Sequence, residues 1–384
     1  MKETGFAYLP NTMEFFSKGI IFDQQFSVSE FTYPSLATIE TGRYPQHSQI
    51  FNEEFSGCLA KERRTLSEQM KTLGYYCVNV MGDGGGIYNG TTGGYDRLII
   101  GNSLLAARGV ERTLKHIRAF EECDQFLFLH LGNTHIVTAH RHTPPLAVQT
   151  KTPLHQRLDE RVFAPSRSSV FVPYAPLYVQ IANEGVQDTD RHLACLYDYI
   201  SRNYDEDEYI VQLYSDHGSS CYDREDHFLG DYRFHCAYML RGKGVPALGE
   251  VDELTSTADI YPILGHLAGF RVPDDIDGNL PAVFGGEKRS HVMSNSIFPG
   301  QTYKLCLRTP EYECRLESQN PVEEDGTADL AGAKVEIRSR KGEKLGVEKQ
   351  QLLWDTVFHH LVTYHTASIH NKGHVWPKME DVSL

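Results

Sequence analysis

Short runs of apolar residues alternate with segments of helical periodicity along most of the chain. The runs are long enough for buried strands but too short for buried helices, and they occupy residues 76–81, 126–131 and 209–214. Between them, Thr65 and Glu68 form the sequence pattern of a capping box that opens a helix ending at Gly74, and residues 190–202 repeat apolar side chains at helical spacing. This alternation predicts an α/β fold with a mostly parallel central sheet flanked by helices.

The pattern changes after about residue 290, where short segments typical of antiparallel strands replace the long alternation. Strands are predicted at residues 303–307, 312–317 and 334–338, with a turn at Asp325-Gly326 and a final helix over residues 349–365. We therefore expect two units: a large α/β domain over residues 1–290 and a smaller C-terminal α+β subdomain with an antiparallel sheet over residues 291–384.

Charge and composition narrow the class of partner. The 384 residues include 51 acidic and 37 basic side chains, for a formal charge of −14, which argues against nucleic acid and anionic membranes as partners. No apolar run is long enough for a membrane span, and the eight cysteines contain no CxxC pair, so we expect reduced thiols. The N-terminus shows no signal region, which favours the cytoplasm, with export expected only if a leader precedes this sequence.

The first candidate for chemistry is Thr32. Pro34 suits the first turn of a helix and Gly42 suits its end, so the Thr32 hydroxyl is predicted at a helix N-terminus, where the helix dipole favours an anion. A nucleophile for phosphoryl or sulfuryl transfer is well placed there. The alternative is that Thr32 is only the N-cap of that helix.

The second candidate is the sequence Ser215-Asp-His-Gly218, which directly follows the predicted strand at residues 209–214. Asp216 and His217 at the end of a strand are suitable ligands for a divalent metal ion. The alternative is an Asx turn beside a solvated histidine. Two further histidines could hold a substrate oxygen or protonate a leaving group: His135, just past the predicted strand at residues 126–131, and His227, ten residues after His217. A lone histidine in a loop more often has no such role.

These segments, taken in order, resemble the sulfatase-like members of the alkaline phosphatase superfamily. The segments that carry the resemblance are Pro10-Asn11 and residues 16–22, 32–45, 65–74, 128–135, 215–218, 258–264, 267–269 and 276–278. The resemblance implies that the chain acts on a small anionic ester with a divalent metal ion, either Ca, Mn or Zn.

The resemblance also implies a role for each matching residue. Thr32 takes the place of the nucleophile, and Asp216 and His217 that of metal ligands. His135 and His227 match the histidines that contact the substrate oxyanion. Arg43 and His47 match substrate-site positions that support the nucleophile loop.

The nucleophile position departs from that of sulfatases proper. They carry Cys or Ser there, which is converted to formylglycine, and an Arg four residues later, whereas this chain has Thr32 and Leu36. A Thr hydroxyl serves instead in relatives that cleave or transfer phosphoryl groups. We therefore expect a metal-dependent hydrolase of phosphate or sulfate esters. The alternatives are a phosphotransferase of the same superfamily and a catalytically dead, anion-binding relative.

A second departure concerns the start of the chain. The resemblance implies a first strand, ending in acidic metal ligands, before Pro10, but residues 1–9 contain no such strand and Asp23 lies too far along to replace its ligands. With Asp216 and His217 alone the metal site has two ligands, fewer than such sites generally use. The sequence thus favours either a first strand lying upstream of Met1 or a degenerate relative.

Overall fold

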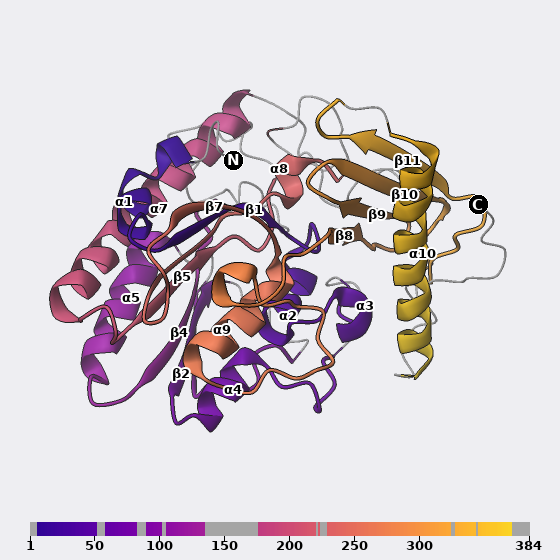
Figure 1. Cartoon of the computed structure of the whole chain (residues 1–384). Helices are drawn as coiled ribbons and strands as arrows, with labels where there is room; N and C mark the ends of the chain where they lie inside the picture. Colours follow the sequence, from indigo (N-terminus) through magenta and orange to yellow (C-terminus); the bar gives the residue numbers. More distant parts are fainter. Residues whose placement is uncertain are drawn as a thin grey trace.

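A computed structural model describes residues 6–51, 58–82, 90–101, 105–134, 176–219, 222, 229–323, 327–342 and 345–370. Two sheets form its centre (Figure 1). One has the order β5-β6-β1-β7, and its strands are β1 (Ile20–Phe26), β5 (Ile210–Tyr214), β6 (Tyr238–Gly242) and β7 (Gly249–Ser256). The other has the order β3-β2-β4, and its strands are β2 (Tyr76–Gly82), β3 (Arg97–Gly101) and β4 (Gln125–His130).

Most of these strands run in the same direction. Strand β2 is parallel to both β3 and β4, and β1 is parallel to β7, while β6 runs antiparallel to its neighbours β1 and β5. The three apolar runs of the sequence are confirmed as β2, β4 and β5. The structure therefore confirms the predicted α/β class with a mostly parallel centre.

Helices cover both faces, as alternation along β1 shows. Ile20 and Phe22 pack against one group of helices, and Ile21, which points the other way, packs against a second group. The first group consists of α2 (Thr32–Thr41), α4 (Leu66–Thr72) and α9 (Ile260–Ala268). The second consists of α1 (Pro10–Phe16), α5 (Ala106–Ala119) and α7 (Pro176–Asn203). Both groups are visible in Figure 1.

The two central sheets share these layers. Leu127 of β4 and Leu213 of β5 pack with the α1, α5 and α7 cluster, whereas the rings of Phe128 and Tyr214, on the opposite face, lie 6.4 Å apart. Strands β4 and β5 thus present matching faces, and the residues after both strands lie near each other. The carboxyl ends of parallel strands are where such folds place their chemistry.

The C-terminal part is an antiparallel sheet, as predicted. Its order is β11-β10-β9-β8, and its strands are β8 (Val292–Ser296), β9 (Thr302–Arg308), β10 (Tyr312–Pro321) and β11 (Lys334–Ser339). Helix α10 (Val347–His370) packs on it through Leu353, Trp354 and Val357. The same core includes Val28 and Phe51 from the first part of the chain. The boundary near residue 290 stays a prediction, and the Asp325-Gly326 turn lies outside the described residues.

Local sequence signals agree with the structure. Thr65 and Glu68 form both hydrogen bonds of the capping box that opens α4, and Gly74 has a positive φ of 92° just after it. The shorter helices are α3 (Pro45–Ser48) and α8 (Asp231–Phe234), with 3₁₀ turns η1 (Phe6–Tyr8), η4 (Thr257–Asp259) and η5 (Ala282–Phe284). The cysteines in the described part of the chain are free, and none of its helices is long and apolar enough to cross a membrane.

Glu40 is a buried carboxyl in α2, and it makes fold stability depend on pH. Burial raises the pKa of Glu40 to about 7, although hydrogen bonds from Tyr95 and from the backbone of Ser67 and Leu66 oppose the shift. A folded-state pKa above the unfolded one gives stability that is complete below the unfolded value and is lost as pH rises through about 7. Between about pH 5 and pH 9 this loss is of order 3 kcal/mol at most.

We therefore predict that Glu40→Gln removes the loss of stability that ionisation of Glu40 causes between about pH 5 and pH 9. Urea denaturation at the two pH values measures it, with the exposed Glu121→Gln as the matched control. Parallel pH dependence of the free energy of unfolding in the native chain and in Glu40→Gln would contradict the prediction.

Candidate active site

Helix α2 presents Thr32 at its first residue. The N-cap is Phe31, which has an extended backbone and makes no side-chain capping bond, so the Thr32 hydroxyl does not serve as the N-cap. The helix ends at Gly42, whose φ of 67° is left-handed, as the sequence predicted. The Thr32 side chain therefore sits at the positive end of the helix dipole, where a negative charge is stabilised.

A tight backbone approach fixes the loop that follows β5. The Gly218 N–H donates to the Arg233 carbonyl at 2.7 Å, and the Ser219 N–H donates to the Tyr232 carbonyl at 2.9 Å. A Cβ at position 218 would lie 2.0 Å from that Tyr232 oxygen, so only glycine fits here. Helix α8 thus holds the loop from Asp216 to Ser219 in place.

This loop brings its histidine to the candidate nucleophile. His217 Nε2 lies 3.1 Å from Thr32 Oγ1, across 185 residues of sequence. The other ring nitrogen, Nδ1, lies 2.8 Å from the Gly218 carbonyl oxygen. Because a carbonyl can only accept, Nδ1 carries the proton, and in a neutral ring Nε2 has its lone pair free to face the Thr32 hydroxyl.

Asp216 completes the group. Its Oδ2 lies 3.5 Å from His217 Nε2, and its side chain is one-fifth exposed. Burial acts to raise the pKa of Asp216, but the charges of His217 and His130, together with hydrogen bonds from the His217 backbone and from the Thr32 hydroxyl, outweigh burial and hold this pKa below its usual value. Asp216 is therefore an anion at neutral pH. The one proton of the Thr32 hydroxyl can go either to Asp216 or to His217 Nε2.

The Asp216–His217 pair fits two positions of a divalent metal site. Two ligand atoms about 2.1 Å from a tetrahedral ion lie about 3.4 Å apart, close to the separation observed between Oδ2 and Nε2. Within the described ranges, however, no group of three or more His, Cys, Asp or Glu side chains could hold a metal ion. The structure thus supplies two ligands that suit a metal.

His130, the last residue of β4, is a site residue that the sequence reasoning missed. Its charge acts on Asp216, and its buried Nδ1 has no hydrogen-bond partner in the part of the chain that the structure describes. Its position at the carboxyl end of an apolar strand is the sequence signal that points to it, in the same way as the position of His135 just past that strand. His135 and His227 themselves lie outside the described residues.

Arg43 and His47 are not brought to Thr32. They follow the opposite end of α2, about 15 Å along the helix axis from Thr32. There the Arg43 guanidinium pairs with Asp275 at 2.5 Å, and His47 Nδ1 lies 2.8 Å from Asp277 Oδ2. These contacts tie the end of α2 to the loop around residues 275–278, which also donates two backbone N–H groups to the Gly42 carbonyl.

Comparison with known proteins shows which family and which solved structures this chain resembles. A family model described as Sulfatase matches residues 4–270. Among solved structures, BT4656 in complex with D-glucosamine-2-N,6-O-disulfate is 13% identical, with a TM-score of 0.68 over 93% of both chains. The phosphonate monoester hydrolase SpPMH from Silicibacter pomeroyi is 14% identical, with a TM-score of 0.67 over 96% of this chain and 91% of its own.

A third structure, the putative sulfatase yidJ from Bacteroides fragilis, is 15% identical, with a TM-score of 0.68 over 94% of this chain and 90% of its own. No curated protein matches the chain. At these identities the solved structures establish the fold, and the family model covers more than half of the sequence.

The Gly218 contact gives a direct test of the loop. We predict that Gly218→Ala lowers the free energy of unfolding by about 1–3 kcal/mol, because the new Cβ forces the loop away from the Tyr232 carbonyl. The matched control is Gly346→Ala, where a Cβ meets nothing within 4 Å and the effect should stay within about 0.5 kcal/mol. Urea denaturation of both variants measures the difference, and equal stabilities would refute the close approach.

Proposed function

The chain belongs to the sulfatase family of ester hydrolases, and on that premise we propose that it hydrolyses phosphate or sulfate esters with Thr32 as the nucleophile and a divalent metal ion at Asp216 and His217. The observation that carries the proposal is the 3.1 Å contact between Thr32 Oγ1 and His217 Nε2, with the Asp216 carboxylate beside it. The N-cap of α2 is Phe31, so the Thr32 hydroxyl is not used to cap its own helix.

The chemistry proceeds in two displacements. The Thr32 hydroxyl passes its proton to solvent and Oγ attacks phosphorus, and the ester bond breaks as the new P–O bond forms. The leaving oxygen takes a proton from His135 or His227 and departs as an alcohol. Water then attacks the phosphothreonine, releasing inorganic phosphate and restoring the hydroxyl. The N-terminus of α2 stabilises the negative charge on the group being transferred, because that group sits at the positive end of the helix dipole.

The metal and the Thr32 proton compete for one lone pair. His217 Nε2 can accept the Thr32 proton or bind an ion, but not both at once. A divalent ion at Asp216 and His217 would lower the pKa of the Thr32 hydroxyl and polarise the ester. The ion is Ca, Mn or Zn in this proposal. Asp216 and His217 supply two of its ligands, and the described residues bring no third His, Cys, Asp or Glu side chain to them.

Threonine favours phosphate over sulfate esters. A secondary alcohol such as that of Thr32 cannot be oxidised to the aldehyde from which formylglycine chemistry starts, and Leu36 stands where sulfatases proper have arginine. A threonine alkoxide remains a competent nucleophile toward phosphorus. Structures with this fold include one bound to a sulfated sugar and one that is a phosphonate monoester hydrolase, so the fold is compatible with both sulfur- and phosphorus-centred substrates.

The remaining predicted residues take supporting places in the proposal. His135 and His227 contact the substrate oxyanion or protonate the leaving group, with His130 beside Asp216 as a third histidine. Arg43 and His47 act through the loop at residues 275–278 that they bind, and so support α2 from its far end.

The alternative is a catalytically dead relative that retains the anion site, and the two-ligand metal pair is the observation that favours it. Metal content separates the two readings. The active reading predicts that purified protein binds Mn²⁺, Zn²⁺ or Ca²⁺ and turns over an aryl phosphate or aryl sulfate. Protein that binds none of the three ions and cleaves neither ester is the dead relative. Transfer of the phosphoryl group to an added alcohol would instead identify a phosphotransferase.

We predict that Thr32→Ala abolishes turnover, lowering kcat for an aryl phosphate by at least about a thousandfold, because the attacking oxygen is lost. Thr32→Ser is the matched control, since it keeps a hydroxyl in the same place and should retain measurable turnover. Thermal denaturation should give both variants a similar Tm. Full activity in Thr32→Ala would remove Thr32 from the role of nucleophile.

We predict that Asp216→Asn weakens Mn²⁺ binding about 100-fold or more, because the amide replaces an anionic ligand with a neutral one. Asp198→Asn, an exposed carboxylate on α7, is the control and should leave the metal Kd unchanged. Isothermal titration measures both Kd values. Equal affinity in the native chain and in Asp216→Asn would assign the metal elsewhere.

A further inference from the structure

Ser27, the residue after β1, is a fully buried junction between four segments. Its N–H donates to the Phe234 carbonyl of α8 at 2.7 Å. Its carbonyl accepts from the Ser294 hydroxyl of β8 at 2.6 Å. Its hydroxyl oxygen lies 2.5 Å from the Asp216 carbonyl oxygen in the loop after β5, and 3.1 Å from Ser35 Oγ in α2.

The number of donors and acceptors around Ser27 favours one direction for these bonds. The Ser27 hydroxyl has one proton, and it has two carbonyls in reach, those of Asp216 and Ser29. The Ser35 hydroxyl can donate to Ser29 at 3.2 Å, and the Ser29 N–H can donate to Ser27 Oγ at 3.3 Å. With the Ser27 proton on the Asp216 carbonyl, which is 2.5 Å away against 2.7 Å for the Ser29 carbonyl, the Ser35 hydroxyl can supply the Ser29 carbonyl, so that both carbonyls have a donor.

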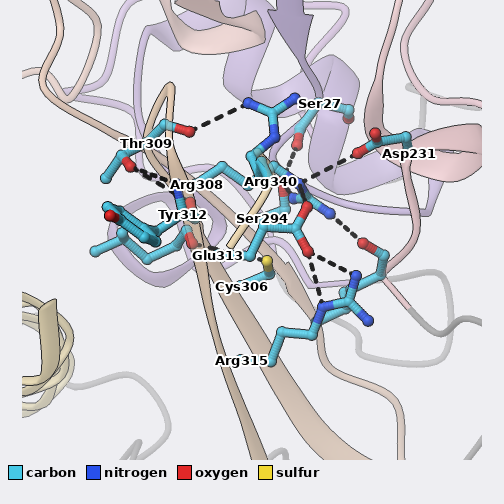
Figure 2. A network of polar contacts seen from close by, with 12 residues as sticks. Ser27, Asp231, Ser294, Cys306, Arg308, Thr309, Tyr312, Glu313, Arg315 and Arg340 are labelled. Atoms are coloured by element: carbon cyan, nitrogen blue, oxygen red, sulfur yellow. Dashed lines mark hydrogen bonds and ion pairs between the residues drawn. The ribbon is translucent and has the colours of Figure 1, made fainter. Parts of the chain in front are cut away.

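The C-terminal sheet holds this junction from the other side. Arg308 of β9 donates from Nη1 to Ser294 Oγ at 3.2 Å, and Figure 2 shows Ser27, Ser294 and Arg308 in one connected network. Arg308 is itself fully buried, paired with Glu313 at 3.2 Å, and its guanidinium lies near the Phe26 ring. A buried cation held on several sides has little freedom to move, so Ser294 is held firmly.

We propose that Ser27 is a positioning residue that sets the distance between Asp216–His217 and Thr32, and that Ser294 and Arg308 are the means by which the C-terminal sheet fixes it. Ser27 acts through the Asp216 backbone on one side and through Ser35, one turn after Thr32 in α2, on the other. Its effect on catalysis rests on the proposed function, whereas its hold on the loop does not.

The chain offers a matched set of serine variants. Ser27→Ala removes the bond to Asp216, and Ser294→Ala removes the bond to the Ser27 carbonyl. Ser318→Ala is the control: Ser318 is also buried, lies in the same sheet as Ser294 and accepts from the Tyr303 N–H at 2.9 Å, and its side-chain hydrogen bonds do not involve Ser27 or Asp216. All three should lower Tm by a similar small amount, no more than about 3 °C.

The activity readouts separate positioning from stability. Ser27→Ala and Ser294→Ala should each weaken Mn²⁺ binding or lower kcat for an aryl phosphate about 10- to 100-fold, with KM little changed, while Ser318→Ala changes neither. Because Ser294 acts through Ser27, adding Ser294→Ala to Ser27→Ala should produce less than the product of the two single effects. Equal effects for Ser294→Ala and Ser318→Ala, or fully multiplicative effects, would overturn the proposal.

Hydrogen exchange tests the positioning role of Ser27 even if the chain has no activity. Backbone amides of residues 215–219 should exchange faster in Ser27→Ala and Ser294→Ala than in the native full-length chain, and Ser318→Ala should leave them unchanged. Unchanged exchange in Ser27→Ala would refute the positioning role whatever the activity. Faster exchange in a chain that neither binds metal nor turns over ester would keep the positioning role and refute the proposed function.

Discussion

The contact between Thr32 Oγ1 and His217 Nε2 joins two loops that are 185 residues apart in the sequence. One loop connects β1 to α2, and the other follows β5 toward α8. Each is fixed by backbone: the first by the start of α2 at Thr32, the second by the approach of Gly218 to the Tyr232 carbonyl. The central sheet matters to the chemistry because β1 and β5 lie in the same sheet and deliver both loops to one edge of it.

Buried polar groups restrain the loops of the site more tightly than apolar packing does. Apolar clusters on the two faces of the sheet fix the helices but leave loop conformation open. Ser27, Ser294 and Arg308 then connect the C-terminal sheet to the Asp216 carbonyl, and a buried ion pair joins Glu30, two residues before Thr32, to Arg233 of α8. An unpaired buried charge or hydroxyl is costly, so each of these groups restrains its partners strongly. The C-terminal sheet is therefore connected through buried hydrogen bonds to the loop that carries Asp216.

Local signals in the sequence predicted local features well. The apolar runs gave β2, β4 and β5, the Thr65 pattern gave a capping box, and Pro34 with Gly42 gave the bounds of α2. Thr32 and Asp216 could be selected as candidates because they begin a predicted helix and follow a predicted strand, which are local features of the sequence. Ser27 could not, because its role depends on Asp216, 189 residues away. His130 ends an apolar strand and so carried the same kind of signal, but its effect on Asp216, 86 residues away, appears only in the fold. Likewise, only the fold shows that Arg43 and His47 bind the loop at residues 275–278 at the far end of α2.

The central claim is that Thr32 forms a covalent bond to the group being transferred. Acid quenching during turnover of an aryl phosphate, followed by proteolysis and peptide mass spectrometry, tests it most directly, because phosphothreonine survives acid. The account predicts a phosphoryl group on Thr32 that appears with substrate and is lost as substrate runs out. Steady turnover with Thr32 unmodified at every quench time, or with the phosphoryl group on another residue, would contradict it.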